Sequence, residues 1–221
     1  MAETFGTLKT KVQTFLHHVN IKDVATTPAD FTGTLLNMGL HALERANNWK
    51  CMENKNTGTV DSSTDYISGT PLTRYKEIKS LFFTVSDVLK RMEKVGYAEL
   101  LSYYPNGSSS KGIPKACAHS PADSKIWVRP YPDATYSYTL ITYNYTADMS
   151  TDSDTNWWTD NNAWEILMYA AVVEGGILLR DNYLQGFAEV LGQKINSLEN
   201  TENSEELAGS HQNIQPGVTK I

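Results

Sequence analysis

The sequence predicts an α+β protein that is mainly α: a helical bundle of about four helices with an inserted antiparallel β module and an extended C-terminal tail. Apolar residues recur at helical spacing near both ends of the chain, whereas the middle holds short β-branched and aromatic runs divided by Gly, Pro and Ser. After Ser197 the chain becomes polar. We therefore predict a bundle from residues 1–55 and 157–200, a β-rich insertion over 56–156, and a C-terminal extension over 201–221.

Two helices are expected before the β-rich insertion. The first is predicted by a single apolar stripe at helical spacing: Phe5, Leu8, Val12, Phe15, Leu16 and Val19. The second begins where Thr27 can cap the free amides, Pro28 fits the first helical position and Asp30 stands where a capping box places its carboxylate. This helix should have neighbours on two sides, because it carries two apolar stripes. One stripe contains Phe31, Leu35, Met38, Ala42, Ala46 and Trp49, and the other contains Leu36, Leu40 and Leu43.

The β-rich insertion is predicted by three strand-like runs, EIKSLFFTV, KIWVRP and YSYTLITYNY. We expect a helical segment in GYAELLSYYPN and a loop in GSSSKG. Alternation divides the last strand into two faces: Tyr136, Tyr138, Leu140, Thr142 and Asn144, and Ser137, Thr139, Ile141, Tyr143 and Tyr145. Both faces contain tyrosines, so the second face is expected to be neither core nor open to water.

Two further helices are expected after residue 157. The segment AWEILMYAAVVEGGILL, residues 163–179, is apolar nearly all round, but it is short for a bilayer and contains two glutamates, which predicts a buried helix. The pair Gly175-Gly176 predicts a close helix approach or a kink. The last helix carries one stripe of Leu184, Phe187, Ala188, Leu191, Ile195 and Leu198. Beyond it, the isolated apolar residues are too few to form a core and need a partner to be ordered: Leu207, Ile214, Val218 and Ile221.

Composition limits the classes of function. The chain has 221 residues and a net charge of -6, with a pI of about 5.4, which argues against binding nucleic acid by neutralising phosphates. The 12 Tyr and 5 Trp residues suit contact surfaces. The N-terminal residues MAETFGTLKTKV lack the apolar run of a signal peptide, so we expect a soluble intracellular product without a membrane partner.

The motifs of enzymes and metal sites are largely missing from the sequence. It has no G-x-S-x-G elbow, phosphate loop or dinucleotide fingerprint. Asp152, Asp154 and Asn156 have the spacing of a calcium loop, but Trp157 replaces the turn glycine and Ala163 replaces the bidentate glutamate, which favours a solvated loop. We expect no catalytic residue, no cofactor and no metal.

The remaining reactive side chains favour structural roles. Cys117 and His119 are too close in sequence for a finger-type zinc pair, and Cys51 has no local activating group. Glu165 and Glu174 lie among apolar residues, where a carboxylate must be paired or protonated. An ion pair with a neighbouring helix or subunit, for example through Arg45, is the preferred interpretation, although paired carboxylates for glycoside hydrolysis need only spatial proximity and stay open.

Four stretches resemble, in order, the head-to-tail adaptor proteins of tailed bacteriophages. The third combines a P-x-P strand, a tyrosine-rich strand, an acidic loop, paired tryptophans and a long helix of small residues. The stretches are FGTLKTKVQTFLHHV with PADFTGTLLNMGLHALERANNWKCME, PLTRYKEIKSLFFT, KIWVRPYPDATYSYTLITYNYTADMSTDSDTNWWTDNNAWEILMYAAVVEGGILLRD, and YLQGFAEVLGQKINSLENTENSEE. Together they cover most of the chain.

The resemblance implies a structural virion protein made in the host cytoplasm and located at the head-tail interface. Copies would form a ring, a dodecamer by analogy, that docks beneath the portal protein, meets tail or nozzle proteins and lets double-stranded DNA pass without base reading. Neighbouring copies would then cover the aromatic surface of Tyr131, Tyr136, Tyr143, Tyr145, Trp157 and Trp158. The C-terminal segment would reach the portal through Leu207, Ile214, Pro216, Val218 and Ile221.

Two rival classes stay open at the level of sequence. One is a tail-associated peptidoglycan hydrolase, in which case a buried glutamate such as Glu165 would be essential for lysis. The other is a different connector component, either a stopper or a tail terminator, which would differ in its binding partner.

Overall fold

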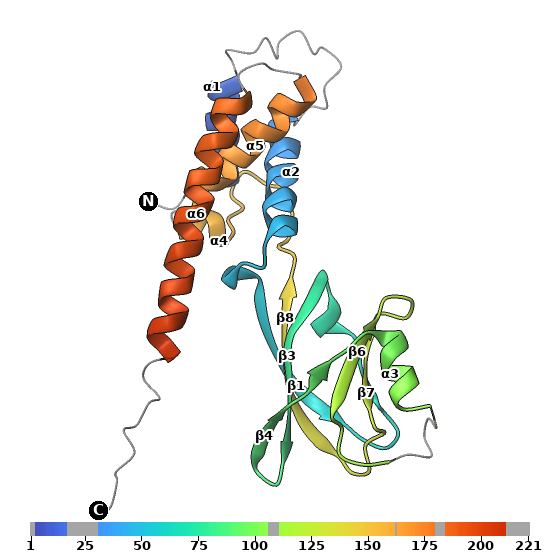
Figure 1. Ribbon diagram of the computed structural model, residues 1–221. Coiled ribbons are helices and arrows are strands. Elements are labelled where there is room, and N and C mark those ends of the chain that lie inside the picture. The colour runs from blue at the N-terminus through green and yellow to red at the C-terminus, as the bar shows by residue number, and fades with distance from the viewer. Residues whose placement is uncertain (1–2, 17–30, 106–110, 162, 180–183, 211–221) are drawn as a thin grey trace, which may run out of the picture. The chain divides into compact units, whose positions relative to one another are not determined.

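The computed structural model describes residues 3–16, 31–105, 111–161, 163–179 and 184–210. The chain divides into two compact units (Figure 1). We call Met1–Asn47 with Ala147–Ile221 the helical unit, and Asn48–Thr146 the β unit. The β unit is thus one continuous segment placed between two parts of the helical unit.

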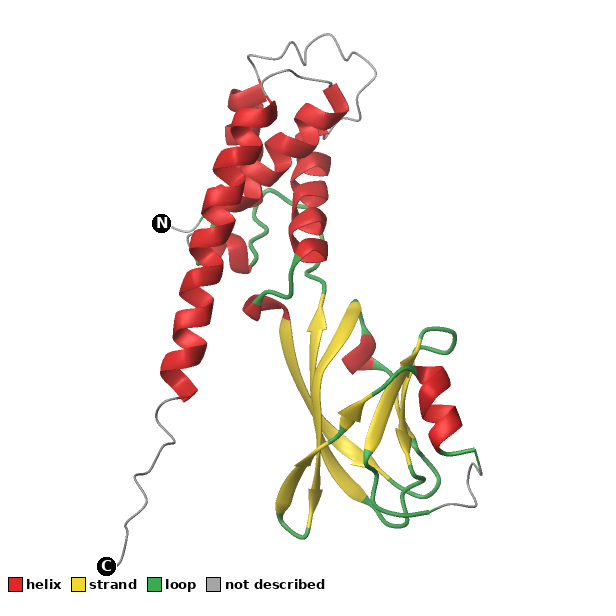
Figure 2. Ribbon diagram, in the orientation of Figure 1, coloured by secondary structure: helices red, strands yellow, loops and turns green. Residues whose placement is uncertain are grey.

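The helical unit contains α1 (Phe5–Leu16), α2 (Phe31–Ala46), the short α4 (Trp157–Asp160), α5 (Trp164–Leu179) and α6 (Leu184–Ser210). Helix α5 contacts the other four of these helices, which lie beside it in Figure 2. Because neighbours surround it, α5 has apolar residues on nearly every side. In the described part of the chain, no helix has both the length and the apolar character needed to cross a membrane.

The predicted apolar stripes are largely buried. In α1, the sequence-predicted residues Phe5, Leu8, Val12 and Leu16 are all buried, while Phe15 is 40% exposed. The four leucines of α2 that were assigned to two stripes are also buried, as expected for a helix with neighbours on two sides: Leu35, Leu36, Leu40 and Leu43. The predicted cap at residues 27–30, like Val19, lies outside the described residues.

Helices α2 and α5 approach each other closely at glycine. A Cβ added at Gly39 would lie 2.6 Å from the backbone nitrogen of Ala171 and 2.9 Å from the carbonyl carbon of Ala170. A Cβ added at Gly175 would lie 3.0 Å from Cδ1 of Leu35. The predicted close approach at Gly175 is therefore confirmed, and Gly39 is the tighter of the two contacts because backbone atoms cannot move aside as easily as a side chain.

The β unit is a pair of four-stranded sheets. One has the order β1 (Glu53–Val60), β8 (Tyr136–Asn144), β3 (Tyr75–Val85), β4 (Val88–Arg91) and is antiparallel throughout. The other has the order β2 (Tyr66–Ile67), β7 (Lys125–Arg129), β6 (Ala116–Ser120), β5 (Glu93–Lys94), with β5 and β6 parallel. Helix α3 (Tyr97–Tyr103) contacts β6, and short 3-10 turns occupy Lys50–Met52 and Thr70–Leu72.

The β unit has its own core. It is built from both sheets and contains Val60, Ile67, Ile78, Leu81, Phe83, Met92, Cys117, Ile126, Val128 and Leu140. The prediction of a mainly α protein with a smaller β module is therefore wrong: the described residues hold six α-helices and eight strands, and the strands close a core of their own. The prediction of an antiparallel module also fails at the parallel pair of β5 and β6.

The last helix departs from the predicted extended tail. A tail was expected from residue 201, but α6 runs for 27 residues and ends at Ser210. Residues 211–221 lie outside the described part of the chain. A polar sequence with good helix formers can continue an existing helix, because elongation costs much less than nucleation.

Candidate interaction surfaces

One face of the sheet β1-β8-β3-β4 is the inner face, and it packs in the core of the β unit. Along β8, Leu140 belongs to this core and Tyr136 and Tyr138 pack against it. The alternating side chains Thr139 and Ile141 must therefore point to the opposite face. The alternation read from the sequence assigned these β8 residues to the correct faces. The core formed with the second sheet lies on the inner face.

The opposite face combines apolar and charged side chains of both signs. Ile141 is paired with Lys55 of β1, and Phe82 of β3 is paired with Thr139 of β8 and Arg91 of β4. Directly paired residues lie on the same face of a sheet. Leu89, paired with Thr84, joins this face by the same alternation. We call this surface the outer sheet face: Glu53, Lys55, Glu77, Phe82, Thr84, Leu89, Arg91, Thr139, Ile141 and Tyr143.

The hairpin that ends this face is strained and apolar. Its two turn residues, Ser86 and Asp87, have φ angles of 51° and 62°, the left-handed region required by the favoured two-residue hairpin turn and usually occupied by Gly or Asn. Val88 and Leu89 follow at once and are 57% and 63% exposed. Successive strand residues point to opposite faces, so Leu89 but not Val88 adds to the outer sheet face.

A second exposed apolar surface lies at the end of α5. Ile177 and Leu178 are 54% and 52% exposed, and Glu174 lies one turn earlier. Residues three and four apart share a helix face, so these three side chains form one surface. We call it the α5 end patch: Glu174, Ile177 and Leu178.

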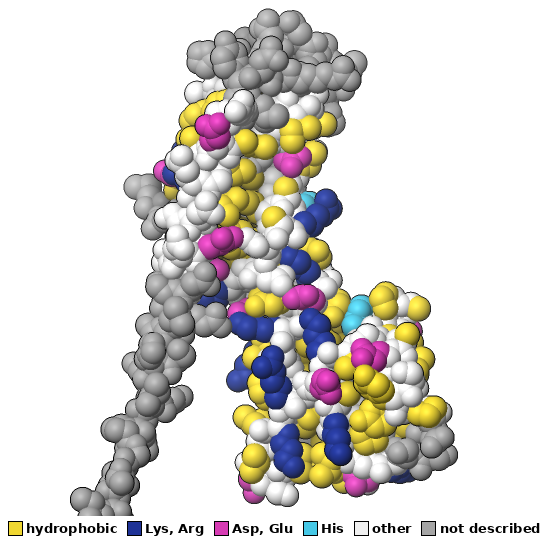
Figure 3. Space-filling model, in the orientation of Figure 1, with side chains coloured by type: hydrophobic (Ala, Val, Ile, Leu, Met, Phe, Trp, Pro, Cys, Tyr) yellow, Lys and Arg dark blue, Asp and Glu magenta, His cyan; other side chains and the backbone are white. Residues whose placement is uncertain are grey.

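Charge is divided unequally between the two units. The β unit contains 12 Lys and Arg and 9 Asp and Glu, which is a net charge of +3. The helical unit contains the other 7 basic and 16 acidic residues, a net charge of -9, so that the whole chain has -6. Figure 3 shows Lys and Arg side chains gathered on the visible face of the β unit. The acidic balance seen in the sequence therefore belongs to the helical unit alone.

Two of the tyrosines expected at contacts between copies lie beside lysines. Tyr143 is on the outer sheet face, with Nζ of Lys79 at 5.7 Å from its ring centroid. Tyr145 follows β8, with Nζ of Lys76 at 5.9 Å from its ring centroid. Both rings are half-buried in the single chain. Lysine at this distance is attracted by the ring face and covers it from water.

Two other expected contact tyrosines have partners within the β unit. The ring of Tyr131 lies under the Arg129 guanidinium, whose carbon is 4.2 Å from the ring centroid. Arg129 also forms a buried ion pair with Asp65. Tyr136 is on the inner face, and its hydroxyl donates a hydrogen bond to Oδ1 of Asp133 at 2.5 Å. This hydrogen bond is the main cause of a raised pKa at Tyr136.

The paired tryptophans lie at different depths. Trp158 is fully buried inside the helical unit, whereas Trp157 keeps part of its surface and meets Trp158 edge to face at 5.5 Å between centroids. Trp158 therefore belongs to the core of its own chain. Trp164, expected on an apolar face, is half-buried under Lys11, with Nζ at 3.6 Å from a ring centroid.

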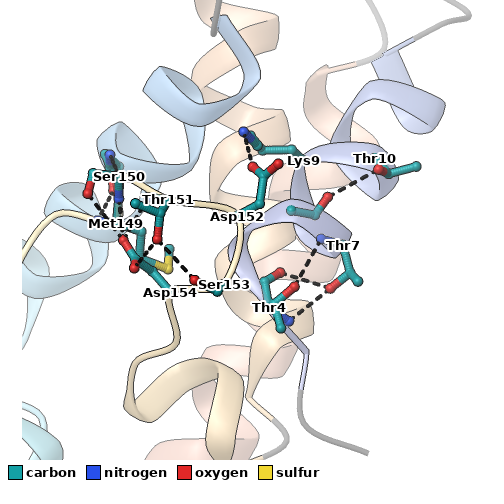
Figure 4. A network of polar contacts seen from close by, with 12 residues as sticks. Thr4, Thr7, Lys9, Thr10, Met149, Ser150, Thr151, Asp152, Ser153 and Asp154 are labelled. Carbon is teal, nitrogen blue, oxygen red and sulfur yellow. Dashed lines mark hydrogen bonds and ion pairs between the residues drawn. The ribbon is translucent and has the colours of Figure 1, made fainter.

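Hydrogen bonds and an ion pair connect the carboxylates of the acidic loop before α4 to nearby residues (Figure 4). Oδ2 of Asp154 accepts hydrogen bonds from the backbone amides of Ser150 and Thr151, at 2.6 and 2.8 Å. The side-chain and backbone bonds from Thr151 are the largest causes of a pKa of Asp154 well below its usual range. The carboxylates of this loop are used locally, and the described residues contain no cluster of three metal-binding side chains.

The same loop caps α1. The amides of Phe5 and Gly6 donate to the backbone oxygens of Asp154 and Asp152 at 2.9 and 3.0 Å, and the Asp152 carboxylate forms an ion pair with Lys9 (Figure 4). Free amides at a helix N-terminus need such acceptors. The loop is a structural connection between distant parts of the helical unit.

The other reactive side chains have structural surroundings. Burial raises the pKa of the Cys117 thiol to about 12, so it is not an activated nucleophile. His119 stacks on Tyr75 at 4.2 Å between centroids. Glu165 pairs with Lys194 of α6, which confirms that this carboxylate is paired, with a partner other than Arg45. Glu174 forms no ion pair within the described part of the chain.

Sequence reasoning missed the exposed hairpin and the α5 end patch. The hairpin has a usable signal, because FFTV and VLKR flank the two turn residues SD, although Ser and Asp are weaker turn markers than Asn and Gly. The α5 end patch has none, since a continuous apolar helix does not reveal which of its residues reach the surface.

Comparison with known proteins places the chain in a family. No curated protein matches this chain. The family model described as SU10 adaptor protein matches residues 3–211, which include the β unit and the helical unit through the end of α6. This match confirms the resemblance to head-to-tail adaptors that the four sequence stretches suggested. The chain belongs to the SU10 adaptor protein family of bacteriophage adaptors.

Proposed function

We propose that this protein is a structural component of the virion that forms a ring below the portal, extends the DNA channel and joins the capsid vertex to the tail. The family match carries the proposal, because it includes both units and all of α6. On this proposal the protein is made in the host cytoplasm and becomes part of the neck of the particle.

Exposed apolar surfaces support a ring of copies, twelve by analogy with head-to-tail adaptors. The outer sheet face and the α5 end patch would both gain from burial against a neighbouring copy. Five of the six expected contact aromatics keep accessible surface and stay in the proposal: Tyr131, Tyr136, Tyr143, Tyr145 and Trp157. The buried Trp158 would act only by supporting Trp157 from within.

The portal contact is assigned to the C-terminal segment. Leu207 lies in the last turns of α6, and the other apolar residues of the segment follow the helix: Ile214, Pro216, Val218 and Ile221. A polar segment with a few spaced apolar side chains suits binding into grooves of a larger protein. Tail or nozzle proteins would bind elsewhere on the ring, and double-stranded DNA would pass without base reading.

Electron microscopy of the chain mixed with purified portal tests the ring and its location. We expect a ring of this protein on the tail-facing side of the portal ring. A chain that binds a tail-tube protein but not portal would instead be a stopper or tail terminator. A peptidoglycan hydrolase would release soluble fragments from cell walls, and its Glu165→Gln variant would not. That result would show that the protein is a hydrolase and contradict the adaptor proposal.

Variants of the tail test the portal contact. Replacing the apolar residues Leu207, Ile214, Val218 and Ile221 with Ser should abolish co-sedimentation with portal and leave the circular dichroism spectrum unchanged. The matched control replaces the polar residues His211, Gln212 and Asn213 with Ala and should bind as the wild type does. Retained binding by the apolar variant would remove the tail from the contact.

A further inference from the structure

The outer sheet face and the α5 end patch match each other in chemistry. Leu89 on the outer sheet face is 63% exposed and shares that face with the exposed Arg91. Ile177 in the α5 end patch is 54% exposed and shares its helix face with Glu174. Each surface thus presents an exposed aliphatic side chain beside a charge, and the two charges have opposite signs.

We propose that the outer sheet face of one copy docks on the α5 end patch of a second copy, with Leu89 against Ile177 and Leu178, and Arg91 paired with Glu174. This inference rests on the proposed function, since it specifies which surfaces join neighbouring copies in the ring. The outer sheet face of each copy would be covered by the α5 end patch of a neighbouring copy.

Spacing along the two elements is compatible with simultaneous contact. Leu89 and Arg91 are two residues apart on a strand, which separates their Cα atoms by about 6.8 Å along it. Glu174 is three and four residues before Ile177 and Leu178, a rise of about 4.5 to 6 Å along the helix. An aliphatic contact and an ion pair can therefore form side by side without stretching either element.

Charge favours contact between unlike units over contact between like units. The β unit has a net charge of +3 and the helical unit a net charge of -9. Within the described part of the chain, neither Arg91 nor Glu174 forms an ion pair, so both charges are available to a neighbour. Two helical units meeting face to face would instead bring like charges together, which costs free energy and suppresses that arrangement.

The two surfaces differ, so the contact is head to tail. Each copy would offer its outer sheet face to one neighbour and its α5 end patch to the other. Repetition of such a contact closes into a ring when the rotation per copy allows it. A contact between identical surfaces would stop at a dimer.

Cysteine cross-linking tests the contact. The double variant Leu89→Cys with Ile177→Cys, oxidised in the assembly with portal, should give a ladder of covalent multimers on a non-reducing gel. Each single variant should lack the ladder, and the wild type shows the background from native thiols, of which Cys117 is buried. The matched control pairs Ile177→Cys with Leu101→Cys, since Leu101 is 44% exposed on α3, outside the outer sheet face, and should give no ladder.

Charge reversal provides the second readout. Arg91→Glu and Glu174→Arg should each lower the fraction of chain in rings by at least about tenfold, and the combined variant should restore it. Unchanged melting temperatures will show that each variant is folded; in the single chain Arg91 is exposed and Glu174 is half-buried. If rings form but the double cysteine variant gives no ladder and the combined charge variant gives no rescue, the proposed contact is wrong and the proposed ring still holds. If no ring forms at all, both the contact and the ring are wrong.

Discussion

At the scale of single residues, close backbone contacts govern how α2 and α5 pack. Gly39 has no room for a side chain, since an added Cβ would lie 2.6 Å from the Ala171 backbone nitrogen. The neighbouring atoms belong to the backbone of α5 and can yield only if the whole helix shifts. Sequence inspection marked Gly175 as a contact, because two adjacent glycines interrupt an apolar helix, but Gly39 carries no such signal.

We predict that Gly39→Ala lowers the free energy of unfolding by about 1 to 3 kcal/mol, because overpacking outweighs the gain of about 1 kcal/mol in helix propensity. Gly192→Ala in α6 is the control, since its added Cβ would meet no atom within 4 Å. That control should raise stability by roughly 0.5 to 1 kcal/mol. Urea unfolding measures both changes, and equal stabilisation by the two substitutions would refute the close contact.

Asp154 makes the stability of the helical unit depend on acid pH. Its pKa is lowered by hydrogen bonds from Thr151 and Ser150, so its contribution to stability is complete above the ordinary Asp pKa of about 3.9. That contribution is lost as pH falls through the lower folded-state pKa. We predict that Asp154→Asn destabilises the protein at pH 7 and that the difference from wild type shrinks below about pH 4. Thermal melts across pH test this, with the exposed Asp160→Asn as control; a difference that stays constant with pH would contradict it.

At the scale of elements, the sequence predicted long segments better than short ones. The stripes of α1 and α2 were predicted from helical periodicity, and β3, β7 and β8 from their β-branched and aromatic runs. Strand β1, ENKNTGTV, has little apolar alternation because most of its side chains are at the surface. Strands β2 and β5 have only two residues each, too few for any period to be read. The β unit was therefore underestimated, and with it the balance between helix and strand.

Helix α6 is attached less firmly than α1, α2 or α5. Its Phe187 packs on Phe15 and Tyr169, with centroids 6.2 and 6.3 Å apart. Two polar contacts, from Lys194 to Glu165 and from Asn47 to Glu199, are only part-buried. None of the described side chains of α6 is fully buried, which places this helix at the low end of local stability.

Phe187→Ala should therefore release α6 while the rest of the helical unit stays folded. We expect a loss of about 1 to 2 kcal/mol of local stability from the missing aromatic contacts. Hydrogen exchange followed by mass spectrometry should show faster exchange in residues 184–202 and unchanged exchange in α2 and α5. Uniform acceleration in all helices would show that α6 is an integral part of the core.

At the scale of the whole molecule, the chain order distinguishes the two units. The β unit is continuous, and its first and last strands are paired, with Glu53 opposite Tyr143. Its core draws on both sheets and uses only its own residues. The helical unit is divided into two segments. The core of α1 and α2 is therefore incomplete without α5, which comes much later in the chain. Sequence patterns mark the elements but not this closure, which depends on contacts between residues far apart in the chain.

The isolated fragment 48–146 should fold. Its paired ends lose little when the helical unit is removed, and its core is retained in full. We predict a dispersed NMR spectrum and a single cooperative unfolding transition for the fragment. With a net charge of +3 it should bind a cation exchanger at pH 7, whereas the whole chain, with -6, should bind an anion exchanger.

Leu81→Ala, which removes a buried core side chain, should lower the free energy of unfolding of the fragment by about 2 to 5 kcal/mol, and exposed Leu101→Ala should lower it much less. An unfolded fragment would mean that the β unit depends on the helical unit for its stability.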